Sequence, residues 1–132
     1  MQIIVNIDVD DLERAVSFYQ DALGLRAGRR LFGGAVAEML GATVPIYLLA
    51  KAAGTQAVPG DAARRDYRRH WTPVHLDIVV EHIAPAVERA VAAGAKLERA
   101  GETFPWGSLA VLSDPFGHGF CLIEFMEKKG TY

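Results

Sequence analysis

The 132-residue sequence predicts an α+β protein built from two copies of one βαβββ module. First, residues 74–80 alternate as a two-faced strand does, and apolar residues then recur three and four apart, as in an amphipathic helix. Second, the same change from strand to helix already occurs over residues 4–25. Third, each strand–helix pair is followed by segments suited to three short strands separated by turns. The chain therefore reads as one module written twice.

In the first copy, residues 2–9 predict a strand with Asn6 and Asp8 on one face and apolar side chains on the other. Asp10 and Asp11 suit the start of a helix, where carboxylates satisfy free N–H groups, and Gly24 suits its end. Three strands are predicted at residues 26–32, 35–40 and 45–51, with Gly33-Gly34 as a tight turn.

The second copy repeats this order. A strand at residues 74–80 and a helix at 82–93 precede strands at 96–103, 109–112 and 119–125, and turns are predicted at 105–107 and 114–117. Aligning the copies pairs Ile4 with His75 and Asn6 with Asp77. Residues 127–132 suit a loose tail.

We expect a single domain over residues 1–132, with a first module at 1–51, a linker at 52–72 and a second module at 73–127. The linker has no periodicity, and it carries arginines at positions 64, 65, 68 and 69. A solvated surface segment is the favoured interpretation of this cluster, and contact with an anion or a partner is the alternative.

Composition excludes several classes of function. A net charge of −2 gives no reason to expect nucleic acid or an anionic membrane as partner, and no apolar run approaches the roughly 20 residues that a membrane helix needs. The N-terminus begins a strand without a signal segment. Cys121 is the single cysteine, which excludes an intrachain disulfide and suits a reducing compartment. We therefore expect a cytoplasmic protein.

Three stretches carry a resemblance to a known superfamily: VNIDVDDLERAVSFYQDALGL, HLDIVVEHIAPAVERAVAAGA and LSDPFGHGFCLIEF. In this order they resemble the glyoxalase/bleomycin-resistance/dioxygenase (vicinal oxygen chelate) superfamily. The resemblance implies that the two modules form a half-open, curved eight-stranded sheet with a ligand cavity on its concave side. It also implies a homodimer, and in many members a divalent metal in the cavity.

The alternation of the strands places candidate binding residues. If the helices cover the face that carries Val5, Ile7, Leu76 and Ile78, the polar residues between them line the opposite, cavity face. With aromatic residues at strand ends and the cysteine of the last strand, the candidate ligand-binding set is Asn6, Asp8, Tyr47, His75, Asp77, Trp106 and Cys121.

Three members of this set also have a plainer role. Asp8 and Asp77 could act as general acids or bases, or could be strand carboxylates bound to backbone N–H groups or arginines. Cys121 is more often a small buried hydrophobic residue than a nucleophile. His70 and His82 are predicted at the surface.

The resemblance implies metal ligands on the first and last strands of each module, at Ile4, at Tyr47 or Leu49, at His75 and at Cys121. Isoleucine cannot coordinate a metal, so we expect no cofactor and no firmly held divalent metal. Glu124 lies three residues beyond Cys121, and only a β-bulge would turn it into the cavity.

We predict a protein that binds a small organic ligand without a complete metal site. The alternative is a metal-dependent lyase, isomerase or extradiol-type dioxygenase of the same superfamily that uses His75 with displaced ligands. A third hypothesis is an interaction module whose sheets serve assembly.

Overall fold

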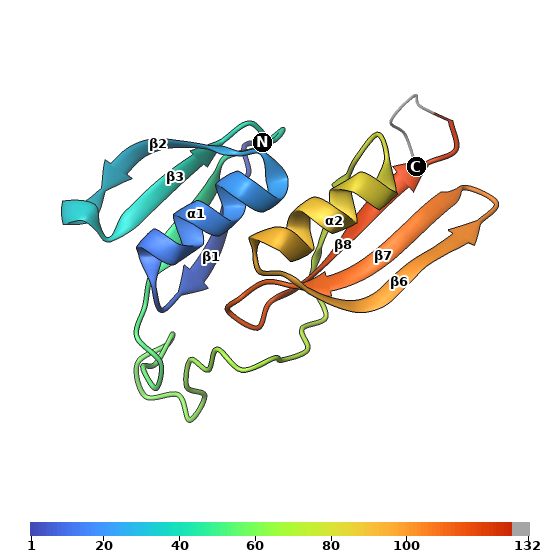
Figure 1. Cartoon of the computed structure of the whole chain (residues 1–132). Helices are drawn as coiled ribbons and strands as arrows, with labels where there is room; N and C mark the ends of the chain where they lie inside the picture. The colour runs from blue at the N-terminus through green and yellow to red at the C-terminus, as the bar shows by residue number, and fades with distance from the viewer. Residues whose placement is uncertain (128–132) are drawn as a thin grey trace. The chain divides into compact units, whose positions relative to one another are not determined.

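A computed structural model describes residues 1–127, and the chain divides into two compact units, Met1–Arg68 and Arg69–Tyr132. Each unit holds one βαβββ module, which confirms the predicted fold class (Figure 1). The first contains β1 (Val5–Val9), α1 (Leu12–Leu23), β2 (Arg26–Leu31), the 3-10 turn η1 (Phe32–Gly34), β3 (Val36–Leu40) and β4 (Ile46–Ala50). The second contains β5 (Leu76–Val79), α2 (Ile83–Ala93), β6 (Lys96–Phe104), β7 (Gly107–Ser113) and β8 (Gly119–Phe125). The predicted tail beyond residue 127 lies outside the described residues.

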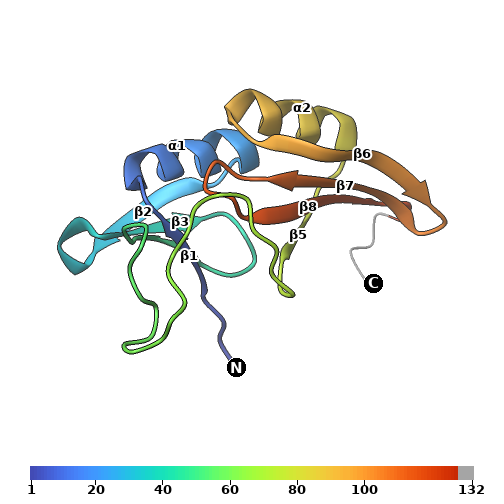
Figure 2. The ribbon, with the colours of Figure 1, turned by 90° about the horizontal axis from the view of Figure 1, so that it is seen from below.

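The first module is a four-stranded sheet in the order β1-β4-β3-β2, with β1 and β4 parallel and the other pairs antiparallel. Helix α1 lies across one face of this sheet (Figure 2). As predicted, Asp11 caps the helix, because its carboxylate accepts a hydrogen bond from Arg14 N at 3.1 Å. Gly24 ends it with a left-handed φ of 71°.

Strand pairing in the first module separates an apolar face from a polar face. Ile7 pairs with Leu48, which is fully buried and pairs in turn with the buried Ala37. One residue earlier, Asn6 pairs with Tyr47 on the opposite face. This is the alternation that the sequence predicts for the first strand.

The second module has the same topology, in the order β5-β8-β7-β6, with helix α2 across one face (Figure 2). A contact identifies this face: the Glu124 carboxylate accepts a 2.7 Å hydrogen bond from Ile83 N, at the first residue of α2. Glu124 therefore lies on the helix side of β8, and residues of opposite parity, including Cys121, lie on the other side.

No bulge turns Glu124 toward the cavity face. The pairing of β7 with β8 runs from Gly107–Phe125 to Ser113–Gly119 without a shift of register. The alternative that a bulge supplies Glu124 as a ligand on the face of His75 is therefore wrong, since this carboxylate caps α2 instead.

The favoured interpretation of the arginine cluster as solvated holds for Arg64 and Arg68, which are exposed, but is wrong for Arg65. Arg65 is 16% exposed and donates to the Asp8 carboxylate at 2.8 Å, although the two residues lie 57 positions apart. Arg69 pairs with Glu98 of β6 at 2.6 Å. These contacts anchor parts of a segment that has no helix or strand of its own.

His70 also differs from the prediction. It is half-buried, and its Nε2 lies 3.0 Å from Nδ1 of His118 in the turn after β7.

Within the described residues, no helix is long and apolar enough to span a membrane.

Candidate ligand-binding cavity

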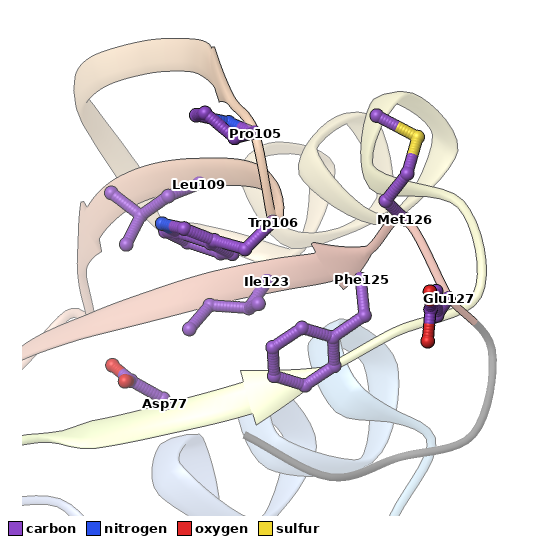
Figure 3. A pocket seen from close by; sticks show the side chains of 8 residues that line it. All are labelled: Asp77, Pro105, Trp106, Leu109, Ile123, Phe125, Met126 and Glu127. Atoms are coloured by element: carbon purple, nitrogen blue, oxygen red, sulfur yellow. The ribbon is translucent and has the colours of Figure 1, made fainter.

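The second module carries an open cavity of about 560 Å³ on the sheet face away from α2. Its walls are apolar and come from the β6–β7 turn, β7, β8 and the residue after β8: Pro105, Trp106, Leu109, Ile123, Phe125 and Met126. Two carboxylates, Asp77 and Glu127, complete the lining (Figure 3). The cavity is thus an apolar surface with acidic groups at its edges.

The aromatic wall is held by the turn between β6 and β7. The ring of Trp106 stacks on Phe104, with a centroid distance of 5.3 Å and an interplanar angle of 4°, and it lies 6.1 Å from the ring of Phe125. Gly107 lets this turn approach β8, because a Cβ there would lie 2.1 Å from the carbonyl oxygen of Glu124. Met126 N then donates to Trp106 O at 2.9 Å. The position of the indole is therefore fixed by backbone contacts as well as by stacking.

Asp77 belongs to a cluster of three polar side chains. Parallel pairing of β5 with β8 places Asp77 directly beside Cys121, and His75 lies two residues earlier on the same face. His75 Nε2 is 3.1 Å from Asp77 Oδ1, and one potential ligand atom from each of the three residues falls within 4.8 Å of the others. The cluster forms within a single module.

The cysteine of this cluster holds its proton. Burial raises the pKa of Cys121 to about 11, and the charge of Asp77 and its hydrogen bond with the thiol act in the same direction. At neutral pH the thiol is a hydrogen-bond donor to a carboxylate, and it is a poor nucleophile.

The remaining candidate residues lie on the polar face of the first module. Asn6 and Tyr47 are strand neighbours, and Asp8 is engaged by Arg65. Glu38 of β3 is the strand partner of Tyr47, and it accepts two hydrogen bonds from the guanidinium of Arg29, at 3.2 and 2.8 Å. These bonds, with one from the backbone N–H of Arg29, hold the pKa of Glu38 below its usual range. The structure thus groups Asn6, Asp8 and Tyr47 in one module, and His75, Asp77, Trp106 and Cys121 in the other.

Sequence reasoning missed most of the apolar wall. Ile123 and Phe125 share the face of Cys121, so the alternation that located Asp77 could have located them too. Pro105, Met126 and Glu127 lie in a turn and beyond the last strand, where no periodicity points to a face.

The metal positions implied by the resemblance do not form a fitting donor set. The pair Asn6–Tyr47 occupies the register of Asp77–Cys121, which selects Tyr47 rather than Leu49 as the first-module counterpart of Cys121. The four positions are then Ile4, Tyr47, His75 and Cys121, and the first offers no donor atom. Among the four, His75 offers an imidazole, and Cys121 offers a thiol that would have to lose its proton on binding a metal.

Solved structures share this fold over most of the chain. A glyoxalase-related enzyme from Fulvimarina pelagi aligns with a TM-score of 0.73 and 22% identity, over 94% of this chain and 87% of that one. A glyoxalase/bleomycin resistance protein/dioxygenase family enzyme from Burkholderia phytofirmans PsJN aligns with a TM-score of 0.73 and 19% identity, over 93% and 97%. The fosfomycin resistance protein FosX from Listeria monocytogenes aligns with a TM-score of 0.69 and 18% identity, over 94% and 92%. Among curated protein sequences no significant match is found.

The order βαβββ, present twice in one chain, is the fold of the glyoxalase/bleomycin-resistance/dioxygenase superfamily. A family model described as Glyoxalase-like domain matches residues 4–123. The chain belongs to this glyoxalase-like domain family.

Proposed function

We propose that this protein binds a small organic molecule in the cavity of its second module, without a resident metal. The observation that carries the proposal is the cavity itself: about 560 Å³, walled by aromatic and aliphatic side chains, with the carboxylate of Asp77 at one side. Concave apolar sites with a few placed polar groups are the usual form of small-molecule sites.

The metal-free part of the proposal rests on donor chemistry. A catalytic zinc normally takes three protein ligands and a water. Ile4 supplies none, and the Glu124 carboxylate is used at the start of α2.

A direct test uses 2-(naphthalen-2-yl)ethanol, a neutral aromatic probe, followed by saturation-transfer NMR and calorimetry. Trp106→Ala removes an aromatic wall of the cavity and is expected to weaken binding at least about tenfold, since a buried aromatic contact contributes on the order of 1.5–3 kcal/mol. Trp71→Ala is the matched control, because Trp71 is 80% exposed and does not line this cavity. Equal loss in both variants, or no binding to the wild type, contradicts the proposal.

A second candidate function has one observation in its favour. His75, Asp77 and Cys121 bring an imidazole, a carboxylate and a thiol within 4.8 Å, and these residues would hold a divalent metal in a lyase, isomerase or dioxygenase. A bound metal would supply Lewis-acid chemistry beside the cavity. Elemental analysis of protein never exposed to chelator or nickel resin separates the two: about one transition metal per chain, lost in His75→Ala, would establish this candidate and refute metal-free binding.

A further inference from the structure

We propose that the cavity selects an organic cation: a flat aromatic molecule that carries a protonated amine, with Asp77 as its counter-ion. The inference rests on the proposed function and specifies the ligand class of the same cavity. It follows from the charge of the lining, the open bonding capacity of Asp77 and the arrangement of the aromatic rings.

The charged groups on the described residues that line the cavity have one sign. Asp77 and Glu127 are acidic, and none of the described residues that line the cavity is lysine, arginine or histidine. Figure 3 shows Asp77 on one side of the apolar wall and Glu127 at the other end. Arg69 does not line the cavity, and its guanidinium pairs with Glu98. An anionic ligand would meet repulsion in a partly dehydrated site, whereas a cation would be attracted.

Asp77 keeps bonding capacity for a ligand. Its Oδ1 faces His75, and its charge is felt by the thiol of Cys121, yet 29% of its side chain is exposed. An ionised carboxylate accepts about four hydrogen bonds, so these two partners do not saturate it. His75 lines a separate hollow together with Trp71 and Cys121, and it does not line the cavity that Asp77 lines.

The aromatic wall favours a flat, positively charged ligand. The stack of Trp106 on Phe104 supports one face of the indole, and Trp106 remains 44% exposed among the residues that line the cavity. An indole face attracts both aromatic rings and ammonium groups, and tryptophan is the strongest natural partner of a cation. Aliphatic neighbours, Leu109 and Ile123, complete an apolar surface for the body of such a molecule.

The experiment compares three probes of nearly equal shape: 2-(naphthalen-2-yl)ethylamine, the corresponding ethanol and naphthalen-2-ylacetate. Calorimetry at pH 7 with the full chain is expected to give the order amine, alcohol, carboxylate, with the amine at least about tenfold tighter than the alcohol. Asp77→Asn should remove this preference for the amine and leave binding of the alcohol within about threefold. Glu88→Gln is the matched control: this exposed carboxylate lies on α2, outside the cavity lining, so its loss should change the preference by less than about threefold.

The outcomes separate the two proposals. Equal affinity for the three probes, tighter binding of the carboxylate, or an unchanged preference in Asp77→Asn would overturn the cation inference while leaving a small-molecule cavity in place. Failure of all three probes to bind would overturn both. If Asp77→Asn lost its fold, as judged by circular dichroism, Trp106→Leu decides instead: it should weaken the amine more than the alcohol, and an equal loss would refute a cation held on the indole.

Discussion

Replacing Glu124 tests how the second module is assembled. The carboxylate accepts from Ile83 N at 2.7 Å, while His82, the N-cap residue, makes no capping hydrogen bond with its side chain. Glu124→Ala thus leaves a helix N–H without this acceptor and removes a negative charge from the positive end of the helix dipole. A lost cap typically costs about 0.5–2 kcal/mol and a lost charge about 0.3–1 kcal/mol, so we expect a loss of roughly 1–2 kcal/mol.

The assay is urea unfolding followed by tryptophan fluorescence. Both tryptophans, Trp71 and Trp106, belong to the second unit, so the signal reports on the module that contains α2. With a denaturant slope of about 1 kcal/mol/M, the midpoint should fall by roughly 1–2 M in Glu124→Ala. Glu124→Gln keeps an acceptor oxygen, and we expect about half that shift. An unchanged midpoint would refute the capping role. If zinc bound to the wild type and not to Glu124→Ala in a titration as well, Glu124 would be restored as a metal ligand.

Four further outcomes are expected. Gly107→Ala should destabilise the second module by about 3 kcal/mol in the same assay, because its Cβ would meet the Glu124 carbonyl, whereas Gly101→Ala, with space for a Cβ, should stay within about 0.5 kcal/mol. Asp8→Asn should lower the free energy of unfolding by about 1 kcal/mol or less, since the pair with Arg65 is partly exposed. In this variant trypsin should cleave the linker several-fold faster. Because burial raises the pKa of Cys121, its alkylation by iodoacetamide should stay slow at pH 8 and accelerate toward pH 11, and rapid reaction at pH 8 would contradict this. We predict a homodimer, so light scattering should give twice the 14.4 kDa chain mass. A monomer mass at micromolar concentration would count against the homodimer.

The sequence predicted those features that periodicity and local chemistry determine. Alternation placed Asn6 and Asp77 opposite the helices, and strand pairing with the contact from Glu124 to α2 bears this out for the second module. Asp11 and Gly24 marked the ends of the first helix because caps need particular side chains and backbone angles.

The features that the sequence did not predict depend on contacts between distant segments. The ion pair of Arg65 with Asp8 joins positions 57 apart, and no local pattern distinguishes this arginine from the exposed Arg68. The wall formed by Pro105 and Met126 likewise depends on how a turn folds against the end of β8. Spacing along the chain carries no signal for such contacts.

The two modules use equivalent faces differently. In each, the first strand pairs with the last, so that Asn6–Tyr47 corresponds to Asp77–Cys121. On the neighbouring strand, Tyr47 is paired with Glu38, which Arg29 neutralises, whereas Cys121 is paired with the apolar Val111. The first face thus satisfies its charges internally, whereas the second leaves a carboxylate beside an open apolar cavity. Every described residue that lines this cavity belongs to the second module, so the isoleucine at position 4 is not part of its wall.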